Sequence, residues 1–202
     1  MEKVKVSLAI IFFLFISHSS HSQSAGSAPF VRKSLMSMSG GLGGGIFIYH
    51  PVQNIYFTGS FSYCMEERIG IRSDFYLFIP DAAIGGQLDR NSTILLGPEF
   101  HFPAGHLDWT ILFQPGLSFS YLKDEASTNQ TQAEPVLTLS TGLTYYFLHN
   151  FHLGVNAQYL RGNYFSESID RYNISELRFT AALGVNLFVN HQAAYQRKRP
   201  KF

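Results

Sequence analysis

The chain has 202 residues, of which 46% are hydrophobic and 14% are charged, with a formal net charge of +1. This length suits one domain and is too short for a wide porin, and the single cysteine, Cys64, excludes an internal disulfide and a zinc site built on several thiols. Outside the first five and last six residues, nine basic residues (15 − 6) stand against 13 acidic ones (14 − 1), which argues against a nucleic-acid-binding surface.

The N-terminus has the pattern of a secretory signal peptide. Two lysines precede an apolar run, Val6 to Ile16, that is too short to span a membrane as a helix. A polar stretch of small residues, Ser17 to Ser24, follows this run. We therefore expect a signal peptide over 1–22, cleaved near Ser22/Gln23, and an N-terminal leader over 23–33.

Eight segments that follow alternate between an apolar or aromatic side chain and a small or polar one. A period of two indicates a β-strand with one apolar face. The clearest segment places Phe113 and Leu117 on the apolar face and Gln114 and Ser118 on the other. At about 3.3 Å per residue, such a strand is long enough to cross a bilayer when tilted. In chain order, the predicted strands are 37–49, 55–64, 69–79, 93–102, 109–122, 137–147, 151–159 and 177–189.

The connections between these segments alternate between short and long. Short turns are predicted at Glu66-Glu67, at 103–108 and at His149-Asn150, whereas the loops at 80–92, 123–134 and 166–175 are long and polar. An even number of strands returns both termini to one side, and short periplasmic turns with long outer loops are typical of outer-membrane barrels. We predict an all-β fold, an eight-stranded antiparallel up-and-down transmembrane β-barrel over 34–190, followed by a basic C-terminal tail over 191–202.

The composition of the two faces indicates which one points outward. A soluble barrel such as a lipocalin buries its apolar face and shows the polar one to water. Here the polar rows consist of Ser, Thr, Gly and Asn, whereas a water-exposed face usually carries Lys and Glu. We therefore expect the apolar rows to face lipid. Aromatic residues near the ends of these rows are predicted to lie at the lipid interface: Phe102, Trp109, Tyr121, Phe151 and Tyr159.

Several of these features together resemble a known family. The signal peptide, the strand-turn-strand unit from Gly40 to Tyr63, the turn at His149-Asn150 and the closing strand from Leu177 to Val189 resemble the small porin-like outer-membrane β-barrel proteins of the Bacteroidota. The resemblance covers 34–190 and implies an outer-membrane location, with membrane lipid and the barrel-insertion machinery as partners. Such barrels commonly end on an aromatic residue of the last strand, whereas this chain continues beyond it; Phe188 and Phe202 are both candidates for that signal.

Four charged residues on the polar rows are predicted to point into the lumen: Arg72, Asp74, Glu99 and Arg178. The lumen of an eight-stranded barrel is filled by side chains, and buried charges need partners. We expect two basic and two acidic residues to form a network that plugs the barrel. A proton-conducting path is the alternative interpretation of this network.

Other candidate sites have weaker support. His101 and His152 share the inward rows with Glu99, but no spacing typical of a metal site links them, and we interpret them as hydrogen-bonded lumen histidines. A lipid-modifying enzyme needs a Ser and a His near the outer rim, and Ser73 with His50 is the nearest pair. The glycines from Gly40 to Gly45 lack the Lys-Ser/Thr of a phosphate-binding loop and indicate a crowded barrel wall.

The sequence thus predicts a non-enzymatic outer-membrane barrel with a structural role or a role in binding through its loops. It predicts a monomer that uses no cofactor and binds no nucleic acid. The ligand of the outer loops is not specified by the sequence. A lipid-modifying enzyme and a narrow transport pore are the alternatives.

Overall fold

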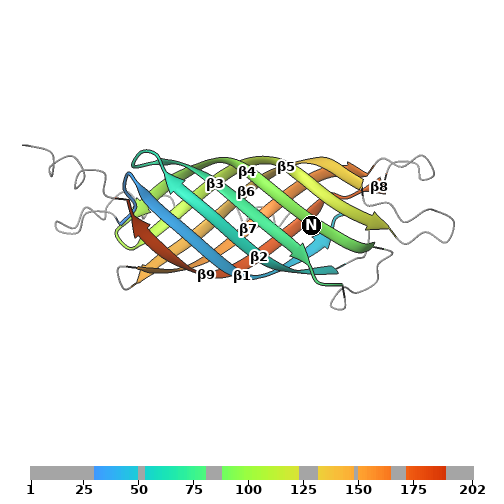
Figure 1. The fold of residues 1–202 in the computed structure, drawn as a ribbon, viewed down its shortest axis with the longest axis horizontal. Coiled ribbons are helices and arrows are strands. Elements are labelled where there is room, and N and C mark those ends of the chain that lie inside the picture. Colours follow the sequence, from blue (N-terminus) through green and yellow to red (C-terminus); the bar gives the residue numbers. More distant parts are fainter. Residues whose placement is uncertain are drawn as a thin grey trace, which may run out of the picture.

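In the computed structural model, residues 30–49, 53–80, 88–122, 132–147, 150–164 and 172–189 are described. Eight long strands form a closed, antiparallel barrel in which each strand pairs with the next one along the chain, and β9 pairs with β1 (Figure 1). The predicted eight-stranded antiparallel barrel is therefore confirmed. The strands are β1 (Leu35–Phe47), β2 (Gln53–Cys64), β3 (Ile69–Phe78), β4 (Leu88–Ala104), β5 (Leu107–Leu122), β6 (Gln132–Phe147), β7 (Phe151–Tyr164), the two-residue β8 (Tyr172–Asn173) and β9 (Glu176–Phe188).

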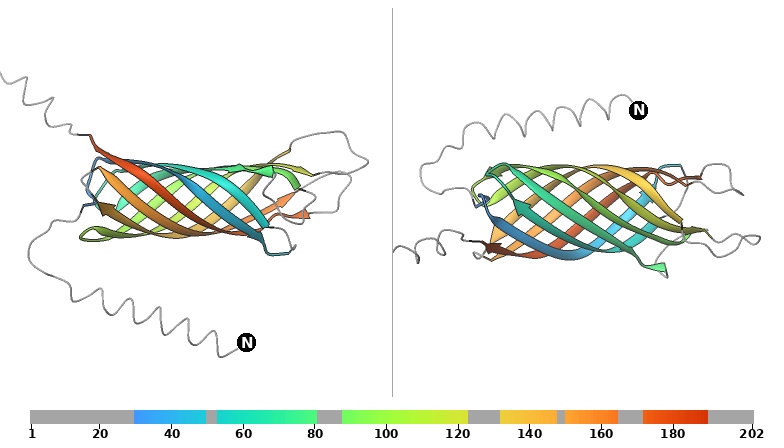
Figure 2. Two further views of the ribbon diagram at one scale, coloured as in Figure 1. Left: turned by 90° about the horizontal axis from the view of Figure 1, so that it is seen from below. Right: turned by 45° about the horizontal axis from the view of Figure 1, so that its top comes forward.

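The strands are tilted against the long axis of the barrel, and the connections separate into two ends (Figure 2). The start of β1, the end of β9 and the connections β2–β3, β4–β5 and β6–β7 lie at one end, which we call the short-turn end. The connections β1–β2, β3–β4, β5–β6 and β7–β9 lie at the other, which we call the loop end. No helix in the described ranges is long and apolar enough to cross a membrane.

Several strands differ in extent from the sequence-based expectation. Strands β4 and β6 begin at Leu88 and Gln132, inside segments predicted as loops, and the turn predicted over 103–108 comprises only Gly105 and His106. Polar residues near a barrel rim lose the two-residue alternation, yet their backbone groups still pair with the neighbouring strand. The signal peptide (1–22), residues 23–29 of the leader, His149 and the basic tail lie outside the described residues.

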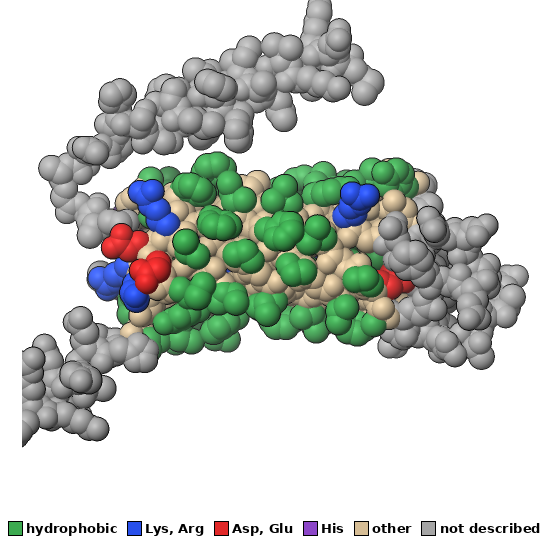
Figure 3. Space-filling model, turned by 90° about the horizontal axis from the view of Figure 1, so that it is seen from above, with side chains coloured by type: hydrophobic (Ala, Val, Ile, Leu, Met, Phe, Trp, Pro, Cys, Tyr) green, Lys and Arg blue, Asp and Glu red, His purple; other side chains and the backbone are tan. Residues whose placement is uncertain are grey.

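The outer surface of the barrel is apolar. Leu42 and Leu183 are 60% and 56% exposed, and similar residues surround the barrel on every long strand (Figure 3). Among the described outward-facing strand residues, Arg161 near the loop end is the single charged one. A soluble monomer rarely exposes an apolar surface this extensive. The apolar rows therefore face outward, as predicted for a transmembrane barrel.

The lumen contains polar layers between two apolar clusters. Toward the loop end, the apolar cluster comprises Phe47, Tyr56, Tyr76, Leu95, Val136, Leu160 and Ile174. At the short-turn end it comprises Val31, Leu35, Cys64 and Tyr146, with Phe30 and Phe188 packed against it. The inward glycines allow the walls to approach closely, since a Cβ at Gly41 would lie 2.0 Å from the backbone oxygen of Ala181.

Candidate functional site

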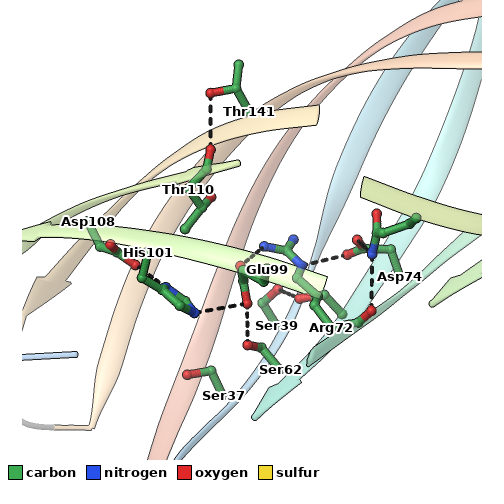
Figure 4. Close-up of polar contacts among 12 residues, drawn as sticks. Ser37, Ser39, Ser62, Arg72, Asp74, Glu99, His101, Asp108, Thr110 and Thr141 are labelled. Atoms are coloured by element: carbon green, nitrogen blue, oxygen red, sulfur yellow. Dashed lines mark hydrogen bonds and ion pairs between the residues drawn. The ribbon is translucent and has the colours of Figure 1, made fainter. Parts of the chain in front are cut away.

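The first polar layer lies in the half of the lumen near the short-turn end (Figure 4). Arg72 and Asp74 point inward because they are two residues apart on β3, and Glu99 faces them from β4. The Arg72 guanidinium donates from Nε to Asp74 Oδ1 at 2.9 Å and from Nη1 to Glu99 Oε1 at 3.2 Å. Gln114 of β5 donates to the other Asp74 oxygen at 2.8 Å. Both carboxylates are thus paired with the same arginine.

A histidine extends this layer toward the short-turn end. His101 Nδ1 lies 2.7 Å from Asp108 Oδ2, across the β4–β5 hairpin. Its Nε2 lies 3.4 Å from Glu99 Oε2 and 3.5 Å from the sulfur of Cys64. The hydroxyl of Ser62 donates to Glu99 Oε2. We call Ser62, Arg72, Asp74, Glu99, His101 and Asp108 the Arg72 cluster.

A polar cavity of about 40 Å³ adjoins the Arg72 cluster. Asp108 Oδ1 and Thr110 Oγ1 are buried, belong to residues that line this cavity, and have no hydrogen-bond partner among the described residues. His152 also lines the cavity, but its Nδ1 is held by Asn186 Oδ1 at 2.8 Å. At roughly 10–15 Å³ for one water, the cavity has room for about three waters, which satisfy these polar groups.

The second polar layer lies toward the loop end and is centred on Arg178 of β9. Its Nε donates to Glu176 Oε2 at 2.8 Å, and its Nη2 donates to Thr93 Oγ1 at 3.1 Å. The guanidinium carbon lies 4.6 Å from the ring centroids of both Tyr56 and Tyr76. The Tyr56 hydroxyl donates to Glu176 at 2.7 Å, and both Arg178 and Glu176 are fully buried. We call Tyr56, Tyr76, Thr93, Glu176 and Arg178 the Arg178 cluster.

The four charged residues predicted for the lumen all lie there, but in two groups. Arg72 contacts Asp74 and Glu99, whereas Arg178 pairs with Glu176, a residue that the sequence-based reasoning missed. The predicted last strand began at 177, so Glu176 was assigned to no face. Its spacing of two residues from Arg178 was the signal that would have placed both on one inward row.

The other sequence-based candidates are dispersed. Within the described ranges, no group of three or more His, Cys, Asp or Glu residues is arranged to hold a metal ion. Glu99 and His101 are adjacent, whereas His152 contacts Asn186 instead. Ser73 lies on the outward row of β3, paired with Phe61 and Leu96, and His50 lies outside the described residues.

The predicted interface aromatics lie on the outward rows where their side chains are described. Phe102, Phe151 and Tyr159 are 40–45% exposed. Trp109 is partly buried, with its ring centroid 5.0 Å from that of Phe102, and its indole N–H donates to Thr141 Oγ1 at 2.7 Å. The side chain of Tyr121 lies outside the described part of the chain.

The last residues of the leader, 30–34, cover the lumen at the short-turn end, and we call them the strap. Phe30 stacks on Tyr146 with ring centroids 4.4 Å apart, and Val31 is buried beside it. The Arg32 guanidinium carbon lies 4.2 Å above the Phe188 ring. Lys33 Nζ lies 2.6 Å from Glu66 Oε1, and this hydrogen bond raises the pKa of Lys33. The strap thus contacts strands on opposite sides of the opening.

Solved outer-membrane barrels share this fold. Neisserial surface protein A matches with a TM-score of 0.59 and 12% identity, over 75% of this chain and 95% of that one. The N-terminal β-barrel domain of Pseudomonas aeruginosa OprF gives 0.55 and 14% over 77% and 98%, and Ail, the attachment invasion locus protein of Yersinia pestis, gives 0.52 and 14% over 77% and 99%. At these identities the likeness concerns the fold alone. No protein-family model matches the chain, and no curated protein matches it.

Proposed function

We propose that the protein is a non-enzymatic outer-membrane barrel that spans the membrane as a plugged scaffold and presents its loops to the outside. The observation that carries this proposal is the combination of an apolar outer surface with a lumen filled by paired charges. An apolar exterior matches hydrocarbon, and a filled lumen matches a small barrel without a channel. In this orientation the short-turn end faces the periplasm.

The two polar layers and the apolar clusters together block passage along the axis. An ion entering from the loop end meets the buried ring of Tyr56 and the fully buried pair of Arg178 and Glu176. Beyond the cavity, the strap and Tyr146 close the short-turn end. An ion that crosses this path must replace buried ion pairs whose separation is costly. The structure therefore favours the plugged scaffold over a narrow transport pore.

The purified, refolded barrel is expected to give no unitary conductance in planar bilayers, because both polar layers are closed by direct side-chain contacts. A wide porin added to the same bilayer serves as the positive control. Membrane fractionation and heat-modifiable migration on gels test the outer-membrane location and show that the measured protein is folded. Stable single-channel steps from folded protein would contradict the plugged lumen and favour a transport role.

The composition of the outer loops indicates the kind of partner they suit. Segments 81–87, 123–131 and 165–171 together contain five acidic and two basic residues, a net charge of −3 (2 − 5). Ail has been solved with the heparin analogue sucrose octasulfate, a polyanion. Because the loops of this chain repel polyanions, we expect them to bind a neutral or basic partner.

This preference is testable with charged surfaces. Cells that display the barrel are expected to adhere to polylysine-coated surfaces more than to heparin-coated ones, at low salt, because the loops are acidic. Replacing Asp124, Glu125, Glu167 and Asp170 by their amides is expected to remove the difference. Stronger adhesion to heparin than to polylysine would contradict the proposed partner class.

A further inference from the structure

Cys64, the only cysteine of the chain, lies at the end of β2 beside a histidine that is itself held by a carboxylate. Its sulfur lies 3.5 Å from His101 Nε2, and His101 Nδ1 lies 2.7 Å from Asp108 Oδ2 (Figure 4 shows the pair of His101 and Asp108). When the Asp108 carboxylate accepts the Nδ1 hydrogen, Nε2 is left as an acceptor directed at the thiol. This order of carboxylate, imidazole and thiol is the arrangement that activates a cysteine nucleophile.

Gly70 makes this approach across β3 sterically accessible. In the sheet register, Gly70 of β3 lies between Cys64 of β2 and Glu99 of β4. A Cβ at this position would lie 3.1 Å from His101 Nε2, closer than most real Cβ contacts. Because glycine has no side chain, the imidazole of His101 reaches over β3 toward the sulfur. The contact between histidine and thiol is therefore built into the wall of the barrel.

The same three residues line the polar cavity, which supplies a second observation that points to a ligand. Cys64, His101 and Asp108 all border this space of about 40 Å³. Two buried oxygens of lining residues, Asp108 Oδ1 and Thr110 Oγ1, have no partner among the described residues, and both residues are at most 2% exposed. A molecule of two or three polar heavy atoms fits the volume and meets hydrogen-bond partners there.

The apolar cluster at the short-turn end limits what reaches the sulfur. Cys64 is 2% exposed and packs with Val31, Leu35 and Tyr146, beneath the ring of Phe30. Bulky thiol reagents are excluded by this packing, whereas a molecule close to water in size passes through local openings of the strap. The site thus selects for a small, uncharged reactant.

We propose that Cys64 is a site of oxidation by small peroxides, with His101 as the proton acceptor and Asp108 as a positioning residue. The Cys64 proton passes to His101 Nε2, and the sulfur attacks one oxygen of hydrogen peroxide. The S–O bond forms as the O–O bond breaks, and the leaving hydroxide takes the proton from His101 to become water. The sulfur is oxidised by two electrons to a sulfenic acid and the peroxide is reduced to water. Glu99, 3.4 Å from Nε2, stabilises the imidazolium that forms during the step.

The experiment uses the full chain folded in phospholipid vesicles and treated with hydrogen peroxide. Tandem mass spectrometry then follows the addition of oxygen at Cys64, separately from oxidation of the four methionines. Cys64 in the folded protein is expected to react faster than Cys64 in the urea-unfolded chain, by roughly 10-fold or more. N-ethylmaleimide, a bulkier reagent, is expected to label only the unfolded chain.

Variants separate activation from simple burial. His101→Gln is expected to slow the oxidation roughly 10-fold or more, because the proton acceptor is lost. His152→Gln is the matched control, since His152 lines the same cavity but contacts Asn186, and its rate is expected to stay unchanged. Asp108→Asn is expected to slow the reaction and to change its pH profile, which a merely structural residue would not do.

The wild-type comparison keeps the proposal falsifiable if a variant fails to fold, as judged by heat-modifiable migration. A folded thiol that reacts no faster than the unfolded one would overturn the proposal. So would a folded His101→Gln protein that reacts at the wild-type rate, or an equal loss of rate in His152→Gln. The inference does not depend on the proposed scaffold function, since conductance and thiol oxidation are measured separately.

Discussion

Replacing Arg178 by leucine is expected to destabilise the folded barrel by about 3–5 kcal/mol, because Glu176 is left buried and without its cation. The pair lies entirely inside the lumen, with both side chains fully buried. The leucine also loses the contacts that the guanidinium makes with the rings of Tyr56 and Tyr76. The free energy of unfolding, measured by urea titration of the barrel in lipid vesicles, tests this expectation.

Two further variants identify the cause of the loss. Arg161→Leu removes an exposed arginine from the outward row of β7 and is expected to change stability by less than about 0.5 kcal/mol. Arg178→Leu combined with Glu176→Gln removes both charges but keeps an acceptor for the Tyr56 hydroxyl, and it is expected to recover part of the loss. If the double variant is no more stable than Arg178→Leu, the unpaired carboxylate is not the source of the destabilisation.

The barrel architecture is predictable from sequence because both faces of a transmembrane strand have demanding environments. Lipid requires apolar residues at every second position, and a narrow lumen requires small or paired polar ones. The row containing Phe113 and Leu117 is exposed on the outside, and Gln114 and Ser118 are buried inside, as the alternation predicts. Ser73 interrupts an apolar row, yet β3 continues through it, because its backbone still pairs with β2 and β4.

The interior contacts are less predictable because alternation gives the direction of a side chain but not its height along the axis. Arg178 and Glu99 both point inward, and only the register and shear of the closed barrel place them in different layers. Asn91 shows the same limit at the rim: it lies in a segment predicted as a loop, yet it is buried in β4 and donates to the Tyr56 hydroxyl at 3.0 Å. Contacts across the lumen therefore require three-dimensional information.

The outer surface supplies the second large expected effect. Leu183→Arg is expected to destabilise the barrel by about 2–4 kcal/mol, because it places a charge on the lipid-facing row near the bilayer midplane. Leu183 lies near the middle of β9, between Gly40 of β1 and Leu153 of β7 in the register, and is 56% exposed. The measurement is the free energy of unfolding in vesicles of fixed lipid composition.

A rim position distinguishes depth in the membrane from the loss of a leucine-sized side chain. Ile48 follows β1 at the loop end and is 49% exposed, so Ile48→Arg is expected to cost about 0–1 kcal/mol near the interface. A cost that depends on depth requires a solvent that changes from hydrocarbon to water along the barrel, which detergent-free vesicles provide. Equal costs at Leu183 and Ile48 would mean that the apolar surface does not sit across a bilayer, whereas a gradient between them would locate the hydrocarbon on β9.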